Sequence, residues 1–157
     1  MVITWKLPPK IKIYEALGAL ADGRVEVGGD SVKVYSSSRG KYYTVAYDPK
    51  TQAIMANDNG SYWQDYLGYP ALVYLMKIGV VPFSETAAAL LADIEWKDIN
   101  QSFKNDWTKT EKYCQDLVVE RDGNLGELLK AVDEIHAFLQ SHPFPQLGKK
   151  MRPPAGY

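Results

Sequence analysis

The chain has 157 residues, of which 46% are apolar and 24% are charged, and its net charge is −1. This length and composition predict a globular domain that can fold without a disulfide or a structural metal. The near-zero net charge excludes the strong field of one sign that attracts nucleic acid over long distances.

The first third of the chain combines one helix with a small sheet. An apolar pattern of helical period over residues 9–21 ends at Gly23. Over residues 24–56 the period changes to two, with turns predicted at residues 28–30 and 48–51. We therefore expect an N-terminal helix followed by a small antiparallel meander of three to four strands.

Residues 61–142 are typical of helices. Ser61 is predicted to cap the first of them, and Gly68 with Pro70 is expected to split its aromatic and apolar stripe into two pieces. Further helices are expected from Ser84 onward.

Strands that are grouped before helices predict an α+β fold, here with four to five helices packed against the meander. We expect a single domain over residues 1–142, sheet-rich over residues 1–60 and helical over residues 61–142. Residues 143–157 are rich in proline, glycine and basic side chains, and we expect them to form an extended tail.

The compartment follows from simple features. The single cysteine, Cys114, cannot form an internal disulfide, and the N-terminal residues lack the basic and apolar pattern of an export signal. The longest apolar run, residues 70–83, contains Lys77 and is shorter than the roughly 20 residues that cross a bilayer. We expect a soluble cytoplasmic protein with no membrane partner.

One candidate binding surface lies on the meander. If the alternating valines face the core, the other face carries Lys33, Tyr35 and Tyr42, with Arg39 and Lys41 in the adjoining turn. Rings that stack on bases, beside cations that contact phosphates, suit single-stranded nucleic acid. We favour the competing interpretation that helices cover this face.

A second candidate is a pocket for a small ligand. Tyr62, Trp63, Asp65 and Tyr66 could form it, next to the polar residues 57–60. We favour a core role, because aromatic residues at helical spacing usually pack inside. A deep cleft that holds an acid of shifted pKa would instead support the ligand site.

No motif predicts a catalytic site, a metal site or a cofactor. His136 and His142 are six residues apart, and no pair of cysteines accompanies them. The leading expectation is a non-catalytic interaction protein that binds a protein partner or forms a homo-oligomer, because the apolar run over residues 69–83 could exceed what one small core covers. Binding of single-stranded nucleic acid is the first alternative, and a small-ligand-binding protein or an enzyme is the second.

Overall fold

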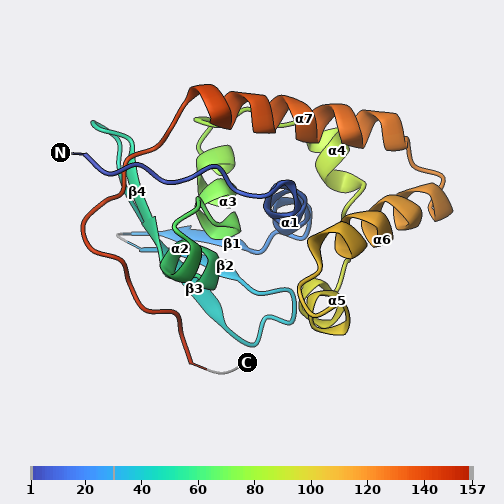
Figure 1. The fold of residues 1–157 in the computed structure, drawn as a ribbon, viewed down its shortest axis with the longest axis horizontal. Helices are drawn as coiled ribbons and strands as arrows, with labels where there is room; N and C mark the ends of the chain where they lie inside the picture. The colour runs from blue at the N-terminus through green and yellow to red at the C-terminus, as the bar shows by residue number, and fades with distance from the viewer. Residues whose placement is uncertain (1, 30, 156–157) are drawn as a thin grey trace.

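Figure 1 shows a computed structural model that describes residues 2–29 and 31–155. The fold is α+β, with an N-terminal helix, a four-stranded antiparallel meander and then a series of helices, as the sequence predicts. The elements are α1 (Lys10–Ala21), β1 (Val25–Gly28), β2 (Ser31–Tyr35), β3 (Tyr42–Asp48), β4 (Ala53–Ala56), α2 (Asn59–Gln64), α3 (Tyr69–Lys77), α4 (Glu85–Ala89), α5 (Trp96–Ser102), α6 (Trp107–Glu120) and α7 (Leu125–Ser141). Asp30 of the first predicted turn and residues 156–157 of the predicted tail lie outside the described residues.

The strands follow one another in the order β1-β2-β3-β4, each antiparallel to the next. Helix α3 packs against β2, β3 and β4, and the sheet buries Val34, Tyr43 and Val45. Strand β1 lies at the edge of the sheet, where Val27, which the alternation predicts to face inward, is 54% exposed. The alternation of apolar residues therefore predicts the buried side chains of the central strands correctly, but it is wrong for Val27 in the edge strand β1.

Among the described residues no helix covers the opposite face of the sheet, so the favoured expectation for this face is wrong. Tyr42 is 43% exposed, and Lys33 and Tyr35 are half-buried. The physical reason is that α4, α6 and α7 pack against α1 rather than on the sheet. Helix α1 contacts α3, α4, α6 and α7.

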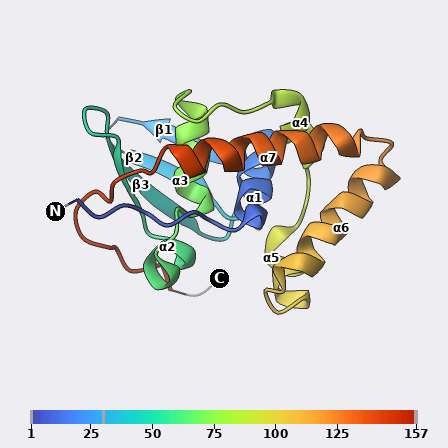
Figure 2. The same cartoon turned by 45° about the horizontal axis from the view of Figure 1, so that its top comes forward.

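The core is built around α1. Ile11, Ile13 and Leu17 are fully buried, and α7 passes over the helix in both views (Figures 1 and 2). The apolar run over residues 69–83 supplies α3, whose buried side chains belong to this core, so it does not form a large apolar surface. No helix within the described residues is long and apolar enough to cross a lipid bilayer.

A break separates α2 from α3, as Gly68 and Pro70 predict. Asp65 ends α2 in the left-handed conformation with φ 61°, and Pro70 occupies the first turn of α3. The predicted N-cap, Ser61, is wrong: Asp58 caps α2 by accepting the Ser61 N–H at 3.2 Å, and Ser61 lies within the helix. Asp58, three positions earlier, is also a strong capping residue, so the sequence offers two candidates for this cap.

The C-terminal segment is extended but attached to the domain. The Trp5 N–H donates to the Phe144 carbonyl at 2.9 Å, and the Ile54 N–H donates to the Pro145 carbonyl at 2.9 Å. In Figure 2 this segment runs from the end of α7 past the N-terminal residues. Phe144 is 3% exposed within the core, which therefore continues past residue 142, where the sequence analysis ended the domain.

Candidate functional site

A cavity of about 620 Å³ opens among α1, α2, α5 and the loop between β2 and β3. Its walls are rich in rings and in charges. The aromatic lining residues are Tyr43, Trp63, Tyr66, Tyr69, Trp96 and Trp107. The charged lining residues are Lys12, Glu15, Arg24, Asp58, Lys97 and Lys104.

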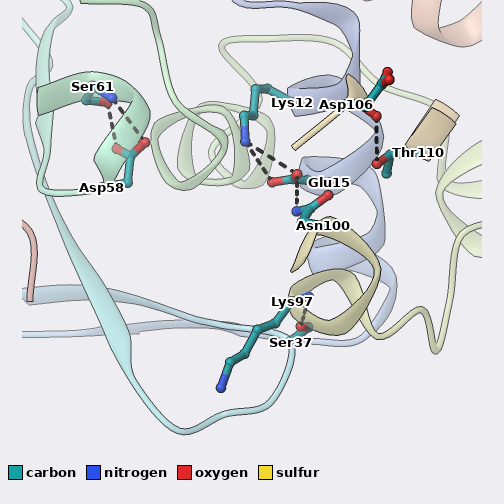
Figure 3. Close-up of polar contacts among 9 residues, drawn as sticks. All are labelled: Lys12, Glu15, Ser37, Asp58, Ser61, Lys97, Asn100, Asp106 and Thr110. Atoms are coloured by element: carbon teal, nitrogen blue, oxygen red, sulfur yellow. Dashed lines mark hydrogen bonds and ion pairs between the residues drawn. The ribbon is translucent and has the colours of Figure 1, made fainter. Parts of the chain in front are cut away.

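Helix α1 contributes a buried ion pair to this cavity. Lys12 and Glu15 are three residues apart and therefore share one face of the helix, and their Nζ and Oε1 atoms are 3.4 Å apart. Glu15 also accepts a hydrogen bond of 3.1 Å from Asn100 Nδ2 of α5 (Figure 3). The Lys12 ammonium also lies 4.4 Å from the centre of the Trp107 ring.

The segment around α2 forms a second wall. Asp58 accepts both the N–H and the hydroxyl of Ser61, the latter at 2.6 Å (Figure 3). Gly68 packs directly against this carboxylate, since a Cβ at Gly68 would lie 2.0 Å from Asp58 Oδ2. Gly60 leaves room for the Tyr66 ring in the same way, with a Cβ only 2.3 Å from its nearest ring atom. These two glycines permit the close packing that holds Asp58 and Tyr66 at the cavity.

The loop between β2 and β3 closes the end of the cavity that meets α5. The Ser37 hydroxyl accepts the Lys97 N–H at 3.0 Å and so joins the loop to the helix (Figure 3). Burial and the nearby charge of Lys97 lower the pKa of Lys41. Lys97 is one of the cationic residues that line the cavity at this end, whereas Lys41 lies outside the lining.

The titratable groups of the cavity influence one another. Burial raises the pKa of the Asp58 carboxyl, against the opposing effects of the Ser61 hydrogen bonds and the charge of Lys12. Burial lowers the pKa of Lys12, but Glu15, Tyr66 and Asp58 outweigh it, and the net shift is upward. Burial also raises the pKa of the Tyr66 and Tyr69 hydroxyls, that of Tyr69 well above its usual value. A cavity with several perturbed groups is typical of a functional site.

Three cavity residues carry buried polar side-chain atoms without a hydrogen-bond partner among the described residues. They are Arg24, through Nε and Nη2, Asn100, through Oδ1, and Trp96, through Nε1. The Trp96 Nε1 atom lies against Gly18 of α1, where a Cβ would be 2.8 Å away. Buried polar atoms are nearly always hydrogen-bonded in native proteins, and among the described residues Arg24 Nε has only an ion pair, with Asp22 Oδ2 at 3.7 Å.

The structure separates the four residues that the sequence suggested for a pocket. Trp63 and Tyr66 line the cavity, while Tyr62 and Asp65 lie outside its lining. Tyr62 packs edge-on against Trp63 with ring centres 4.7 Å apart, and Asp65 pairs with Lys150. Trp63 is 63% exposed, so the interpretation of this aromatic as a core residue is wrong, because the short helix α2 lies at the surface.

The five residues suggested on the sheet lie outside the cavity lining, on and beside the uncovered face. The rings of Tyr35 and Tyr42 are 5.9 Å apart, and Lys33 Nζ lies 4.8 Å from the centre of the Tyr42 ring. Arg39 donates to the Asp22 carbonyl at 3.0 Å, and Lys41 lies over the Tyr43 ring.

Sequence reasoning missed Lys12, Glu15 and Arg24. A signal existed for the first two, because charged residues three apart on an otherwise apolar helix indicate a polar feature within the core. Arg24 gave no signal, since an arginine between a helix and a strand is usually solvated and its burial depends on the packing of other elements.

In the part of the chain that the structure describes, no three His, Cys, Asp or Glu residues are grouped so that they could hold a metal ion. No curated protein and no solved structure matches the chain. A family model described as "Uncharacterised conserved protein UCP014422" matches residues 5–144, which include the cavity residues. The chain therefore belongs to the family of uncharacterised conserved proteins UCP014422.

Proposed function

We propose that this protein binds a small polar molecule in the cavity among α1, α2, α5 and the loop between β2 and β3. The single observation that carries the proposal is Arg24, which lines the cavity at 2% exposure while two of its nitrogen atoms have no hydrogen-bond partner among the described residues. Leaving such donors unpaired costs about 1–3 kcal/mol each, a cost that a bound ligand would remove.

The size and chemistry of the cavity support this proposal. A volume of about 620 Å³ lies within the range of about 300–1,000 Å³ that is usual for small-molecule sites. Rings on several sides can contact a flat ligand, and a few polar groups converge between them. The lining also contains a buried acid of raised pKa, Asp58, and a cleft that holds such an acid favours a ligand site.

Tryptophan signals provide a direct test. Trp63, Trp96 and Trp107 line the cavity, whereas Trp5 is outside its lining and its indole N–H donates to the Ile54 carbonyl at 2.8 Å. A panel of small polar fragments should therefore shift the ¹⁵N–¹H indole signals of the first three and leave that of Trp5 in place. The proposal fails if no fragment shifts these signals, or if binding fragments shift Trp5 alone.

A bulky substitution at the rim of the cavity tests whether the fragments bind at this site. Gln101 is exposed and lines the cavity, and Gln140 is an exposed glutamine on α7 outside it. Gln101→Phe should weaken fragment binding, and the matched variant Gln140→Phe should not. Equal effects of the two variants would argue against this site.

The uncovered sheet face supports a second proposal, binding of single-stranded nucleic acid. The tilted pair of Tyr35 and Tyr42, with Lys33 beside Tyr42, offers rings and a cation on one surface. Tyr42→Ala should weaken binding of an oligonucleotide, and the affinity should fall as salt rises. Binding that is unchanged in Tyr42→Ala would refute this face as the site.

Association with a protein partner or with a second copy, in the cytoplasm, stays a prediction. Its original motive was the apolar run over residues 69–83, which the structure places largely in the core. Sedimentation at high protein concentration tests self-association, and a sharp monomer boundary would contradict it.

A further inference from the structure

We propose that the ligand of this cavity carries an oxyanion, a carboxylate or phosphate group, which binds the Arg24 guanidinium along the edge that has no hydrogen bond in the described part of the chain. This inference rests on the proposed function and specifies the chemistry of the ligand. It is carried by the geometry of Arg24 and by the balance of charges around the cavity.

Arg24 is held so that one edge of its guanidinium makes no hydrogen bond within the described residues and has only a longer ion pair with Asp22. Its Nη1 donates to the Tyr35 carbonyl at 2.9 Å, which fixes the side chain to β2, and the side chain is 3% exposed. The two nitrogens without a hydrogen-bond partner in the described chain, Nε and Nη2, lie on the same edge of the planar group. Two parallel N–H donors on one edge match the two oxygens of a carboxylate or a phosphate.

The nearest acid does not occupy this edge at hydrogen-bond distance. Asp22 Oδ2 lies 3.7 Å from Arg24 Nε, and Asp22 does not line the cavity. Its other oxygen, Oδ1, accepts the Asp93 N–H at 2.8 Å, which anchors the carboxylate elsewhere. Asp22 therefore attracts the guanidinium without completing its hydrogen bonds.

The charges of the lining favour an anion. Four cationic side chains line the cavity against two carboxylates, Glu15 and Asp58. Glu15 is already paired with Lys12, and burial raises the pKa of Asp58, which disfavours its charged form. At the loop end, the side chain of Lys97 adds a positive charge to the lining.

The test uses ligands that share a ring and differ in charge. The probes are phenyl phosphate, benzoate, benzylamine and benzyl alcohol, with binding measured by titration of the Trp63, Trp96 and Trp107 indole signals. We expect the two anions to bind at least about tenfold more tightly than benzyl alcohol, since a bidentate charged pair is worth roughly that factor or more. The ratio of the phosphate to the carboxylate affinity then identifies which oxyanion the site prefers.

Substitutions locate the anion. Arg24→Met should reduce the affinity for the preferred anion about tenfold or more, and Arg24→Lys should do nearly the same because lysine lacks the two-pronged edge. The matched control is Arg121→Met, since Arg121 also donates to a backbone carbonyl, that of Ala92, but lies outside the cavity. If Arg24 variants do not fold, Lys97→Met against the exposed Lys130→Met provides the same comparison at the loop end, with an expected loss of a few-fold.

The outcomes distinguish this inference from the proposed function. If benzyl alcohol or benzylamine shifts the cavity indole signals at concentrations as low as the anions do, the oxyanion is refuted and the cavity remains a ligand site. Anion binding that is equally weakened in the Arg24 or Lys97 variants and in their controls also refutes it. If neither these probes nor the fragment panel shifts the signals, both proposals fail.

Discussion

Replacing Lys12 by methionine tests the ion pair at the centre of the cavity. Methionine keeps most of the apolar stem and removes the charge. It leaves the Glu15 carboxylate, whose side chain is 4% exposed, with Asn100 Nδ2 as its remaining hydrogen-bond donor among the described residues. A buried carboxylate that loses its cation is strongly destabilising, so a clear loss of stability is expected.

The magnitude follows from the separation and the burial. At 3.4 Å and an effective dielectric constant of about 20, the attraction of the two charges is about 5 kcal/mol, and desolvation of both groups offsets part of it. We expect Lys12→Met to lower the free energy of unfolding by about 3 kcal/mol, which corresponds to a fall in Tm of about 10 °C for a chain of this size.

A double-mutant cycle isolates the pair. Glu15→Gln keeps an acceptor for Asn100 and should cost about 1–2 kcal/mol, because Lys12 still faces Asp58 and Tyr66. In the double variant no unpaired carboxylate remains at Glu15, so the loss should be smaller than the sum by about 2 kcal/mol. Urea unfolding followed by tryptophan fluorescence measures each value. Losses that add within about 0.5 kcal/mol would refute the pairing.

The same pair predicts a dependence on pH. The pKa of Lys12 in the folded protein lies above its unfolded value of 10.5, so its stabilising contribution is complete below that pH. The contribution is lost as the pH rises through the raised pKa. Wild-type protein should therefore lose more stability than Lys12→Met above pH 10.5, and parallel curves would contradict this.

Three further changes have outcomes that can be measured by the same unfolding experiments. Gly68→Ala should lower the free energy of unfolding by about 1–3 kcal/mol, because its Cβ would displace the Asp58 carboxylate. The control Gly28→Ala, whose Cβ meets no atom within 4 Å, should lower it by less. Equal losses would contradict the close packing at Gly68. The folded state raises the pKa of Asp58, so the protonated carboxyl stabilises the fold at low pH and this contribution is lost as the pH rises above 3.8. Asp58→Asn should therefore gain stability relative to wild type as the pH rises from about 3 to 6. The opposite trend would contradict the raised pKa. Because Phe144 is buried in the core, Phe144→Ala should lower the free energy of unfolding by about 3 kcal/mol or more. Met151, in the same segment, is 37% exposed, and Met151→Ala should lower it by less than about 0.5 kcal/mol. A small loss for Phe144→Ala would mean that the segment is not anchored.

The sequence predicted local structure well where period and turn residues agree. Gly68 and Pro70 indicated the break between α2 and α3, and the alternation over residues 24–56 indicated the meander. It was less reliable where two signals compete. Asp58 and Ser61 are both good caps three residues apart, and the choice between them depends on the packing of Gly68 against the carboxylate.

The sequence by itself determined the α+β order of elements, because periods of two and 3.6 residues and the positions of glycine and proline are local properties of the chain. Only the tertiary structure decided that one sheet face is uncovered and that a charged cavity lies beside α1. The cavity joins Lys12, Arg24, Asp58 and Lys97, which come from four separate parts of the chain. Their burial, their pairing and the Arg24 edge that lacks a hydrogen bond within the described chain arise from packing between distant elements, for which no local pattern exists.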